Sequence, residues 1–226
     1  MKIAVIISAN SEWQGIKPLF PAARPGHYLY GEKFDAALAG FALTFFHTGW
    51  GKTSSAAALQ SILDHDKPDL IINLGTCGGF GDLTKPGDVI LVTHTLIYDI
   101  VELMDSADVT DYYASSLDLS WLAEPDPYPV LRGLIASADG DLLPEKIPLL
   151  KSLGAIAADW ESASLAWVAQ KNNARLLILR AVSDMVSAEG GEVYGDIESY
   201  MERAKLIMKM LVEQLPAWLK VYRPAG

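Results

Sequence analysis

The sequence has little of what several classes of protein depend on. It has one cysteine, Cys77, so no intrachain disulfide can form and the chain suits a reducing compartment, which we expect to be the cytoplasm. It is also short of positive charge, with 18 Lys and Arg against 28 Asp and Glu and a net charge of −10. Because binding to phosphate backbones needs a basic face, we expect no nucleic-acid partner, although an uncharged nucleoside is not excluded.

Long apolar runs are missing as well. No run is long enough to span a bilayer, so we expect no membrane partner. The N-terminal MKIAVIIS has too short an apolar part for a signal peptide and is followed at once by polar residues. We interpret it as a first buried strand.

Motifs for metal, thiol and nucleotide chemistry are absent from the sequence. The four histidines show no metal-binding spacing, and Cys77 has no evident histidine or aspartate partner. GFGD and GWGK lack the GxGxxG spacing of dinucleotide sites and the GxxxxGK spacing of P-loops. We therefore expect no metal site, no cysteine nucleophile and no cofactor.

What is present is an alternation of short apolar runs with helix-like segments over 226 residues, half of them hydrophobic. The pattern predicts buried strands at 2–8, 69–75, 134–139, 155–158 and 175–184, and helices at 13–19, 52–64, 145–153, 161–172 and 197–215. Residues 76–88 are predicted to be a glycine-rich loop. The alternation favours a single three-layer α/β/α domain over residues 1–226 with a mixed, largely parallel central sheet.

Carboxylates stand at or near the ends of four predicted strands, where α/β folds place their sites. They include Glu12, Asp141, Glu161 and Asp184. Carboxylates without metal, histidine or thiol suit acid–base catalysis on a neutral leaving group, as in glycosidic bond cleavage. In a nucleoside, a purine leaves once a ring nitrogen is protonated, and one carboxylate can accept hydrogen bonds from both ribose hydroxyls.

Each of these carboxylates also has a purely structural explanation. Glu12 could be a solvated residue in the first turn of a helix, and Glu161 could sit at a helix start, both favoured by the helix dipole. Asp184 could cap a following turn. The functional interpretation is favoured because all three fall at strand ends that are expected to converge.

Six motifs, in order along the chain, resemble those of the purine nucleoside phosphorylase and nucleosidase superfamily. INLGTCGG resembles the family's Gly-Ser/Thr-x-Gly-Gly loop, ADWESA stands where the family usually has Glu-Met-Glu, and RAVSD resembles its Arg-Ala-x-Ser-Asp. MKIAVIISANSEW, HTGWGKTSSA and SADGDLL complete the set. Within the superfamily, the chain is most similar to the 5′-methylthioadenosine/S-adenosylhomocysteine nucleosidases.

The resemblance implies a role for each motif residue. Asp184 would be the general acid that protonates purine N7, Glu12 would position or deprotonate the attacking water, and Glu161 would hold the ribose 2′- and 3′-hydroxyls. Trp160 replaces the usual methionine and would pack against the sugar or base. Arg180 would orient Glu161 through an ion pair. The remaining residues that we expect to line the site are Ala9, Trp50, Thr76, Gly78, Leu142 and Ser183.

The resemblance implies hydrolysis of the N-glycosidic bond of an adenosine-type nucleoside, with release of adenine, as in methionine salvage. A phosphorylase needs cationic groups for phosphate, whereas Asn73 stands where hexameric phosphorylases carry an arginine, and Glu12 would repel phosphate. Arg24 lies in a loop that the pattern does not place. A phosphate-dependent purine nucleoside phosphorylase, a futalosine-type nucleosidase and a non-catalytic nucleoside-binding protein remain alternatives.

Two departures from the family pattern bear on specificity. Asp141 stands where a phenylalanine would stack on the purine, so Trp50 or Trp160 would supply the stack, or else the base pocket differs. Residues 100–130 match poorly, although the resemblance implies that they hold the contacts of a homodimer and part of the pocket for the 5′-substituent.

Overall fold

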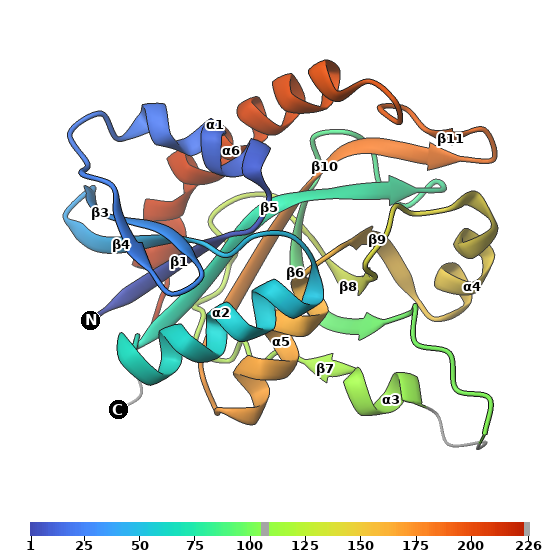
Figure 1. Ribbon diagram of the computed structural model, residues 1–226, viewed down its shortest axis with the longest axis horizontal. Coiled ribbons are helices and arrows are strands. Elements are labelled where there is room, and N and C mark those ends of the chain that lie inside the picture. Colours follow the sequence, from blue (N-terminus) through green and yellow to red (C-terminus); the bar gives the residue numbers. More distant parts are fainter. Residues whose placement is uncertain (105–108, 224–226) are drawn as a thin grey trace.

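The computed structural model describes residues 1–104 and 109–223, in which strands and helices alternate along the chain (Figure 1). The strands are β1 (Ile3–Ile7), β2 (Gly26–Tyr28), β3 (Gly31–Leu38), β4 (Phe41–His47), β5 (Leu70–Phe80), β6 (Val89–Ile97), β7 (Ser115–Ser116), β8 (Leu131–Ser137), β9 (Ala155–Asp159), β10 (Leu176–Ser187) and β11 (Gly190–Gly191). The helices are α1 (Asn10–Ile16), α2 (Gly51–His65), α3 (Val109–Tyr113), α4 (Ile147–Ser152), α5 (Ser162–Lys171) and α6 (Ile197–Lys220), with two short 3₁₀ turns at 17–19 and 144–146.

All eleven of these strands belong to one mixed sheet. Parallel pairings join β1 to β4 and β5, β5 to β10, and β8 to β6 and β9. Antiparallel pairings join β10 to β6, and β5 to β9, so five strands close into a ring, β5–β10–β6–β8–β9. The β2–β3–β4 meander extends the sheet beyond β1.

Helices cover both faces of the sheet, as predicted for an α/β/α architecture: α1 and α6 lie on one side, and α2 and α5 on the other (Figure 1). The alternation of side chains along β1 shows why both faces must be apolar. Ile3, Val5 and Ile7 join the cluster formed with α6, whereas Ala4 and Ile6 join the cluster formed with α2 and α5.

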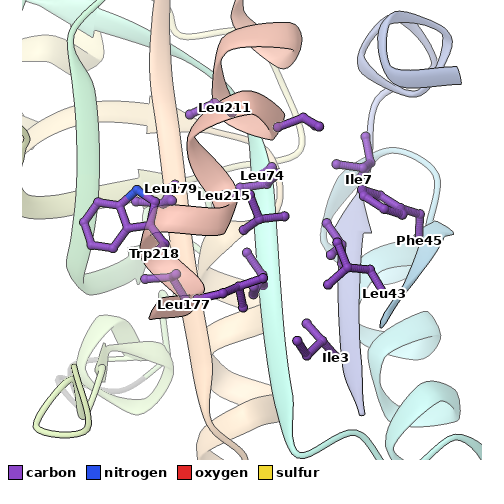
Figure 2. Close-up of a cluster of buried hydrophobic side chains, with 14 of the residues drawn as sticks. Ile3, Ile7, Leu43, Phe45, Leu74, Leu177, Leu179, Leu211, Leu215 and Trp218 are labelled. Atoms are coloured by element: carbon purple, nitrogen blue, oxygen red, sulfur yellow. The ribbon is translucent and has the colours of Figure 1, made fainter. Parts of the chain in front are cut away.

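The larger cluster lies where α6 crosses the sheet (Figure 2). Leu211, Leu215 and Trp218 of the helix lie over Leu177 and Leu179 of β10, and all five side chains are buried. The apolar side of α6 continues to Leu219, so the helix is about one turn longer than the predicted 197–215. No helix in residues 1–104 and 109–223 is long and apolar enough to cross a membrane.

The prediction of a glycine-rich loop over 76–88 was wrong in its first part. Residues 76–80 continue β5, where Gly78 and Gly79 pair with Ala158 and Ala157 of β9. On the other side, Gly78 is in register with Asp184 of β10. Strands that are distant in sequence supply backbone partners on both sides, and local composition carries no sign of them.

Strand β10 continues past its predicted end at Asp184 as far as Ser187. Its register against β5 shifts between Val182 and Asp184, so Ser183 is the extra residue of a bulge. A bulge re-aims the side chains that follow it, and such irregularities are common beside active sites. Here it lies where Ser183 and Asp184 face a cavity.

Candidate active site

A cavity of about 670 Å³ opens where the ends of several strands meet the first turns of α1, α5 and α6. Ten of the eleven site residues predicted from the sequence line it: Ala9, Glu12, Trp50, Thr76, Gly78, Leu142, Trp160, Glu161, Ser183 and Asp184. The eleventh, Arg180, lies behind the cavity wall and is 1% exposed. Segments from residue 9 to residue 201 therefore meet at one place.

Arg180 is surrounded by carboxylates. Its Nε lies 2.9 Å from Asp159 Oδ2, its Nη2 lies 3.5 Å from Glu161 Oε2, and its Nη1 lies 3.9 Å from Glu12 Oε1. The predicted ion pair with Glu161 is thus present, but the tightest contact is to Asp159. One buried guanidinium holds three buried acids together, and it is the cation that makes their burial tolerable.

Asp159 was given no role by the sequence reasoning, although it precedes Trp160 and Glu161 directly. Its oxygens accept hydrogen bonds from Ser137 Oγ (2.5 Å) and from the backbone N–H groups of Glu161 (3.3 Å) and Ser162 (3.2 Å), besides Arg180. Asp159 therefore ties the start of α5 to β8 and to Arg180. The sequence signal that could have identified Asp159 is the pair of serines near predicted strand ends, Ser137 and Ser162, that donate hydrogen bonds to it in the structure.

Glu161 is the N-cap residue of α5, yet its side chain makes no capping hydrogen bond because Asp159 takes the backbone N–H groups there. Its Oε1 accepts instead from the Gly51 N–H at 3.1 Å. Burial raises the pKa of Glu161, while Arg180 opposes that rise. The carboxyl group is therefore held by α2 and β10 at the cavity wall, not in solvent at a helix end.

Gly51 makes this contact possible through its backbone geometry. Its φ of +80° is a conformation that side chains disfavour, and a Cβ there would lie 2.7 Å from Asp139 Oδ1. The first residue of α2 can therefore turn its N–H toward Glu161 only if it is glycine.

Glu12 lies in the first turn of α1, as the alternative structural explanation required. It is only 2% exposed, however, so it is not the solvated residue of that explanation. Its Oε1 accepts from the Thr76 N–H at 2.6 Å and from Thr76 Oγ1 at 2.9 Å, whereas its Oε2 accepts only a longer bond, 3.3 Å, from the Ala9 N–H. A Cβ on Gly75 would overlap Arg180 Nη1 and would lie 2.9 Å from Glu12 Oε1. Glycine at that position lets the two charged groups approach the strand.

Asp184 lies within β10, so it does not cap a turn. Its Oδ1 accepts a 2.6 Å hydrogen bond from Ser183 Oγ, while its Oδ2 is buried and has no hydrogen-bond partner among the described residues. Burial raises the pKa of Asp184, although the Ser183 hydrogen bond and Arg203 oppose the shift. A buried oxygen without a partner, on a carboxyl group that favours its proton, is suited to donating that proton to a ligand.

The wall near Asp184 contains polar and aromatic groups that the sequence reasoning did not assign. Asp141 lines the cavity, which settles its position, and Tyr98 and Tyr194 line it too. The Tyr194 hydroxyl donates a 2.9 Å hydrogen bond to the Leu142 carbonyl, joining the segment before α6 to the one after β8. No stacking ring stands at 141, so a flat base would meet these tyrosines or the tryptophans.

Trp50 and Trp160 also line the cavity. The Trp50 side chain is 59% exposed and Trp160 is 37% exposed. Each immediately precedes one partner of the hydrogen bond from Gly51 to Glu161. The two tryptophans therefore contribute exposed aromatic surface to the cavity lining next to these residues in the sequence.

The cavity lining is acidic. Among the described residues it includes five carboxylates and no Lys, Arg or His side chain; the acids are Glu12, Asp141, Asp159, Glu161 and Asp184. Arg24 is exposed in the loop before β2 and is not part of the lining. Asn73 is buried and donates from Nδ2 to the Ile6 carbonyl at 3.1 Å. No group of three or more His, Cys, Asp or Glu side chains in the described part of the chain is arranged to hold a metal ion.

A family model described as the phosphorylase superfamily matches residues 17–215. The chain belongs to that superfamily. The match begins in the turn after α1 and ends inside α6, so it includes β5 with Thr76, the start of α5 with Glu161, and β10 with Asp184. Glu12 lies just before it.

Relatives within the phosphorylase superfamily are similar to this member over nearly its whole length. The 5′-methylthioadenosine/S-adenosylhomocysteine nucleosidase of Bacillus subtilis (strain 168) is 24% identical over 230 residues, covering 93% of this chain and 98% of that protein. The nucleosidase of the same description from Buchnera aphidicola subsp. Acyrthosiphon pisum (strain APS) is 27% identical, covering 81% and 85%.

Solved structures of superfamily members have the same fold. The MTA/SAH nucleosidase of Streptococcus pneumoniae in complex with 8-aminoadenine superposes with a TM-score of 0.79 at 23% identity, covering 98% of this chain and all of that one. The 5′-methylthioadenosine/S-adenosylhomocysteine nucleosidase of Neisseria meningitidis, in complex with methylthio-immucillin-A, has a TM-score of 0.77 at 21% identity, covering 97% and 98%.

Proposed function

We propose that this protein hydrolyses the N-glycosidic bond of an adenosine-type nucleoside and releases adenine. The observation that carries the proposal is the cavity itself, which brings Glu12, Glu161 and Asp184 together and has no cationic side chain in its described lining. An acidic lining repels phosphate, so water is the nucleophile that the site favours. The descriptions of the relatives from Bacillus subtilis and Buchnera aphidicola support 5′-methylthioadenosine and S-adenosylhomocysteine as substrates.

Each of the three carboxyl groups contacts a different part of the reacting system: the ribose, the purine or the attacking water. In this arrangement the ribose lies against Glu161, whose two oxygens accept from the 2′- and 3′-hydroxyls, while Trp50 and Trp160 flank the sugar at the rim. The purine extends toward Asp184 and the wall formed by Leu142, Tyr98 and Tyr194. The cavity volume of about 670 Å³ is ample for a nucleoside.

The reaction then needs two proton transfers. Water oxygen forms a bond to C1′ as the bond from C1′ to N9 breaks, and the electron pair of that bond moves to the purine. Asp184 gives its proton to N7, which neutralises the leaving group, and Glu12 accepts a proton from the water. Adenine and the free sugar result, and proton exchange with solvent restores the two carboxyl groups.

Negative charge beside the sugar favours this path. Glycosidic cleavage passes through an oxocarbenium-like transition state, in which positive charge develops at C1′ and the ring oxygen. Glu12 places a carboxylate beside that position, held in the buried cluster around Arg180. Groups fixed in this way stabilise the developing charge without having to reorganise.

The proposal also includes that residues 1–226 form a single domain, that two copies of the chain form a homodimer, and that the protein acts in the cytoplasm. The single reduced cysteine supports the compartment, and the exposed apolar side chains that line the cavity, such as Trp50 and Ile197, support a second subunit. The part of the expected dimer contact at residues 105–108 lies outside the described residues.

The test is adenine release from 5′-methylthioadenosine in phosphate-free buffer, repeated with phosphate added. We expect equal rates in the two buffers and a free sugar product. Release only with phosphate would establish a phosphorylase instead. A thermal shift with adenine but no release from any purine nucleoside, including a futalosine-type one, would indicate a binding protein.

A further inference from the structure

The hydroxyl of Tyr200 reaches the site through Thr76. Tyr200 lies in the first turns of α6 and lines the cavity together with Ile197 and Met201. Its phenol oxygen is 3.2 Å from Thr76 Oγ1, which in turn is 2.9 Å from Glu12 Oε1. Three side chains from α6, β5 and α1 therefore form one hydrogen-bonded chain that ends on the water-handling carboxylate.

Counting protons fixes the direction of this chain. The Thr76 hydroxyl has one proton, and it donates that proton to the Glu12 carboxylate, which can only accept. Thr76 Oγ1 therefore has only lone pairs left for Tyr200, so the phenol must be the donor. Burial raises the pKa of Tyr200 to about 12, so its proton is present throughout the neutral range.

The chain makes the two oxygens of Glu12 unequal. Oε1 receives both the N–H and the hydroxyl of Thr76 and lies on the Arg180 side, whereas Oε2 has only the 3.3 Å contact from the Ala9 N–H. From this geometry we infer that Tyr200 is a positioning residue, which orients the Thr76 hydroxyl so that Glu12 Oε1 is occupied and Oε2 is left to accept the proton of the attacking water. The inference rests on the proposed hydrolysis.

The consequence is that the start of α6 takes part in catalysis without touching the reacting atoms. Without the phenol, the Thr76 hydroxyl can rotate, because its own acceptor side is no longer fixed, and Glu12 is less often in the productive arrangement. A ligand's contacts to Glu161 and Asp184 do not pass through Tyr200. The structure therefore predicts a loss of turnover with little loss of binding.

The experiment measures kcat and KM for adenine release from 5′-methylthioadenosine in phosphate-free buffer. We expect Tyr200→Phe to lower kcat about tenfold, the size associated with one hydrogen bond to a charged network, and to change KM less than about threefold. Thr76→Val should lower kcat at least as much. Because the positioning role passes through the Thr76 hydroxyl, the double variant should be no slower than Thr76→Val alone.

The control is Tyr28→Phe, which also removes one partly buried phenol hydrogen bond, 3.0 Å to the His47 carbonyl, at a position outside the cavity lining. It should lose stability but keep kcat. Should Thr76→Val not fold, Thr76→Ser retains the hydroxyl and should keep both near-normal turnover and the tenfold sensitivity to Tyr200→Phe.

Each outcome is decisive. Unchanged kcat in Tyr200→Phe, a rise in KM with kcat preserved, or losses that multiply in the double variant would overturn the positioning role while leaving the hydrolase intact. If the wild-type protein releases no adenine in phosphate-free buffer, the proposed function fails and the inference fails with it.

Discussion

Replacing Arg180 with methionine should strongly destabilise the protein, because it removes the cation from a cluster of three buried acids. The side chain is 1% exposed and contacts Glu12, Asp159 and Glu161 at 3.9, 2.9 and 3.5 Å. Breaking a buried ion pair by removing one partner costs about 3–5 kcal/mol. For a domain of this size, about 1 kcal/mol corresponds to about 2–4 °C in Tm, so we expect a loss of roughly 6–20 °C near neutral pH.

The loss should depend on pH in a defined direction. Burial raises the pKa of Glu161 and Arg180 opposes the rise, so removing Arg180 raises it further. A carboxyl group with a higher pKa in the folded state contributes stability that is fully present below its unfolded pKa of about 4.3 and is lost as pH rises through the folded value. Because the wild-type pKa of Glu161 is about 8, the group is protonated in both folded proteins below that pH. The difference in Tm between wild type and variant should therefore widen as pH rises from about 7 to about 10.

The assay is thermal unfolding followed by circular dichroism across that pH range. The matched control is Arg132→Met, which breaks an ion pair of 2.6 Å with Asp126, where the arginine is 40% exposed. An exposed pair contributes about 1 kcal/mol or less, so this variant should lose only a few degrees. A deficit for Arg180→Met as small as that of the control, or one that does not change with pH, would refute the reasoning.

Three further substitutions test the site directly. Asp184→Asn should lower kcat by about 10²–10⁴-fold, while the affinity for adenine, measured by calorimetry, stays nearly unchanged. The variant should also lose the fall in rate that is expected as pH rises through the raised pKa of Asp184. Equal losses of binding and rate would argue against the role of Asp184 as the acid. Glu161→Gln should weaken turnover of a ribonucleoside about tenfold but spare a 2′,3′-dideoxy analogue, so equal effects on the two would exclude the ribose contact. Gly51→Ala should lower the free energy of unfolding, measured by chemical denaturation, by about 1–2 kcal/mol, and it should raise KM. The reason is that φ of Gly51 is +80° and the new Cβ would lie 2.7 Å from Asp139 Oδ1. An unchanged KM would show that the Gly51 N–H does not position Glu161.

Most of the site could be predicted because its residues follow strands in short motifs. Ten of the eleven predicted residues line one cavity, and Arg180 stands directly behind it. Two roles were missed for the same reason. Asp159 and Tyr200 act through partners that are far away in sequence, Arg180 and Thr76, and of the residues close to them in the chain only Ser162 hints at either role.

The elements were predicted best where a run of apolar residues marks a segment as buried and worst where composition misleads. The buried run of β1 was recognised from its β-branched residues, but residues 76–80 were taken for a loop because of their glycines. Backbone partners on both sides, from β9 and β10, hold that segment extended. Another glycine of β5, Gly75, leaves room for the Arg180 and Glu12 side chains to approach the strand.

By itself the sequence determined the class of the molecule: an acidic α/β chain with one cysteine, apolar strands, and carboxylates at strand ends. Those properties depend on composition and on the period of side chains along a strand or helix, which are local. Only the tertiary structure decided which oxygens are free. The register of β10 against β5 at Asp184, the ion pair of Asp159 with Arg180 and the contact of Thr76 with Tyr200 each join segments that the chain order keeps apart. Together they determine which carboxylate oxygens are occupied by protein donors and which face the cavity.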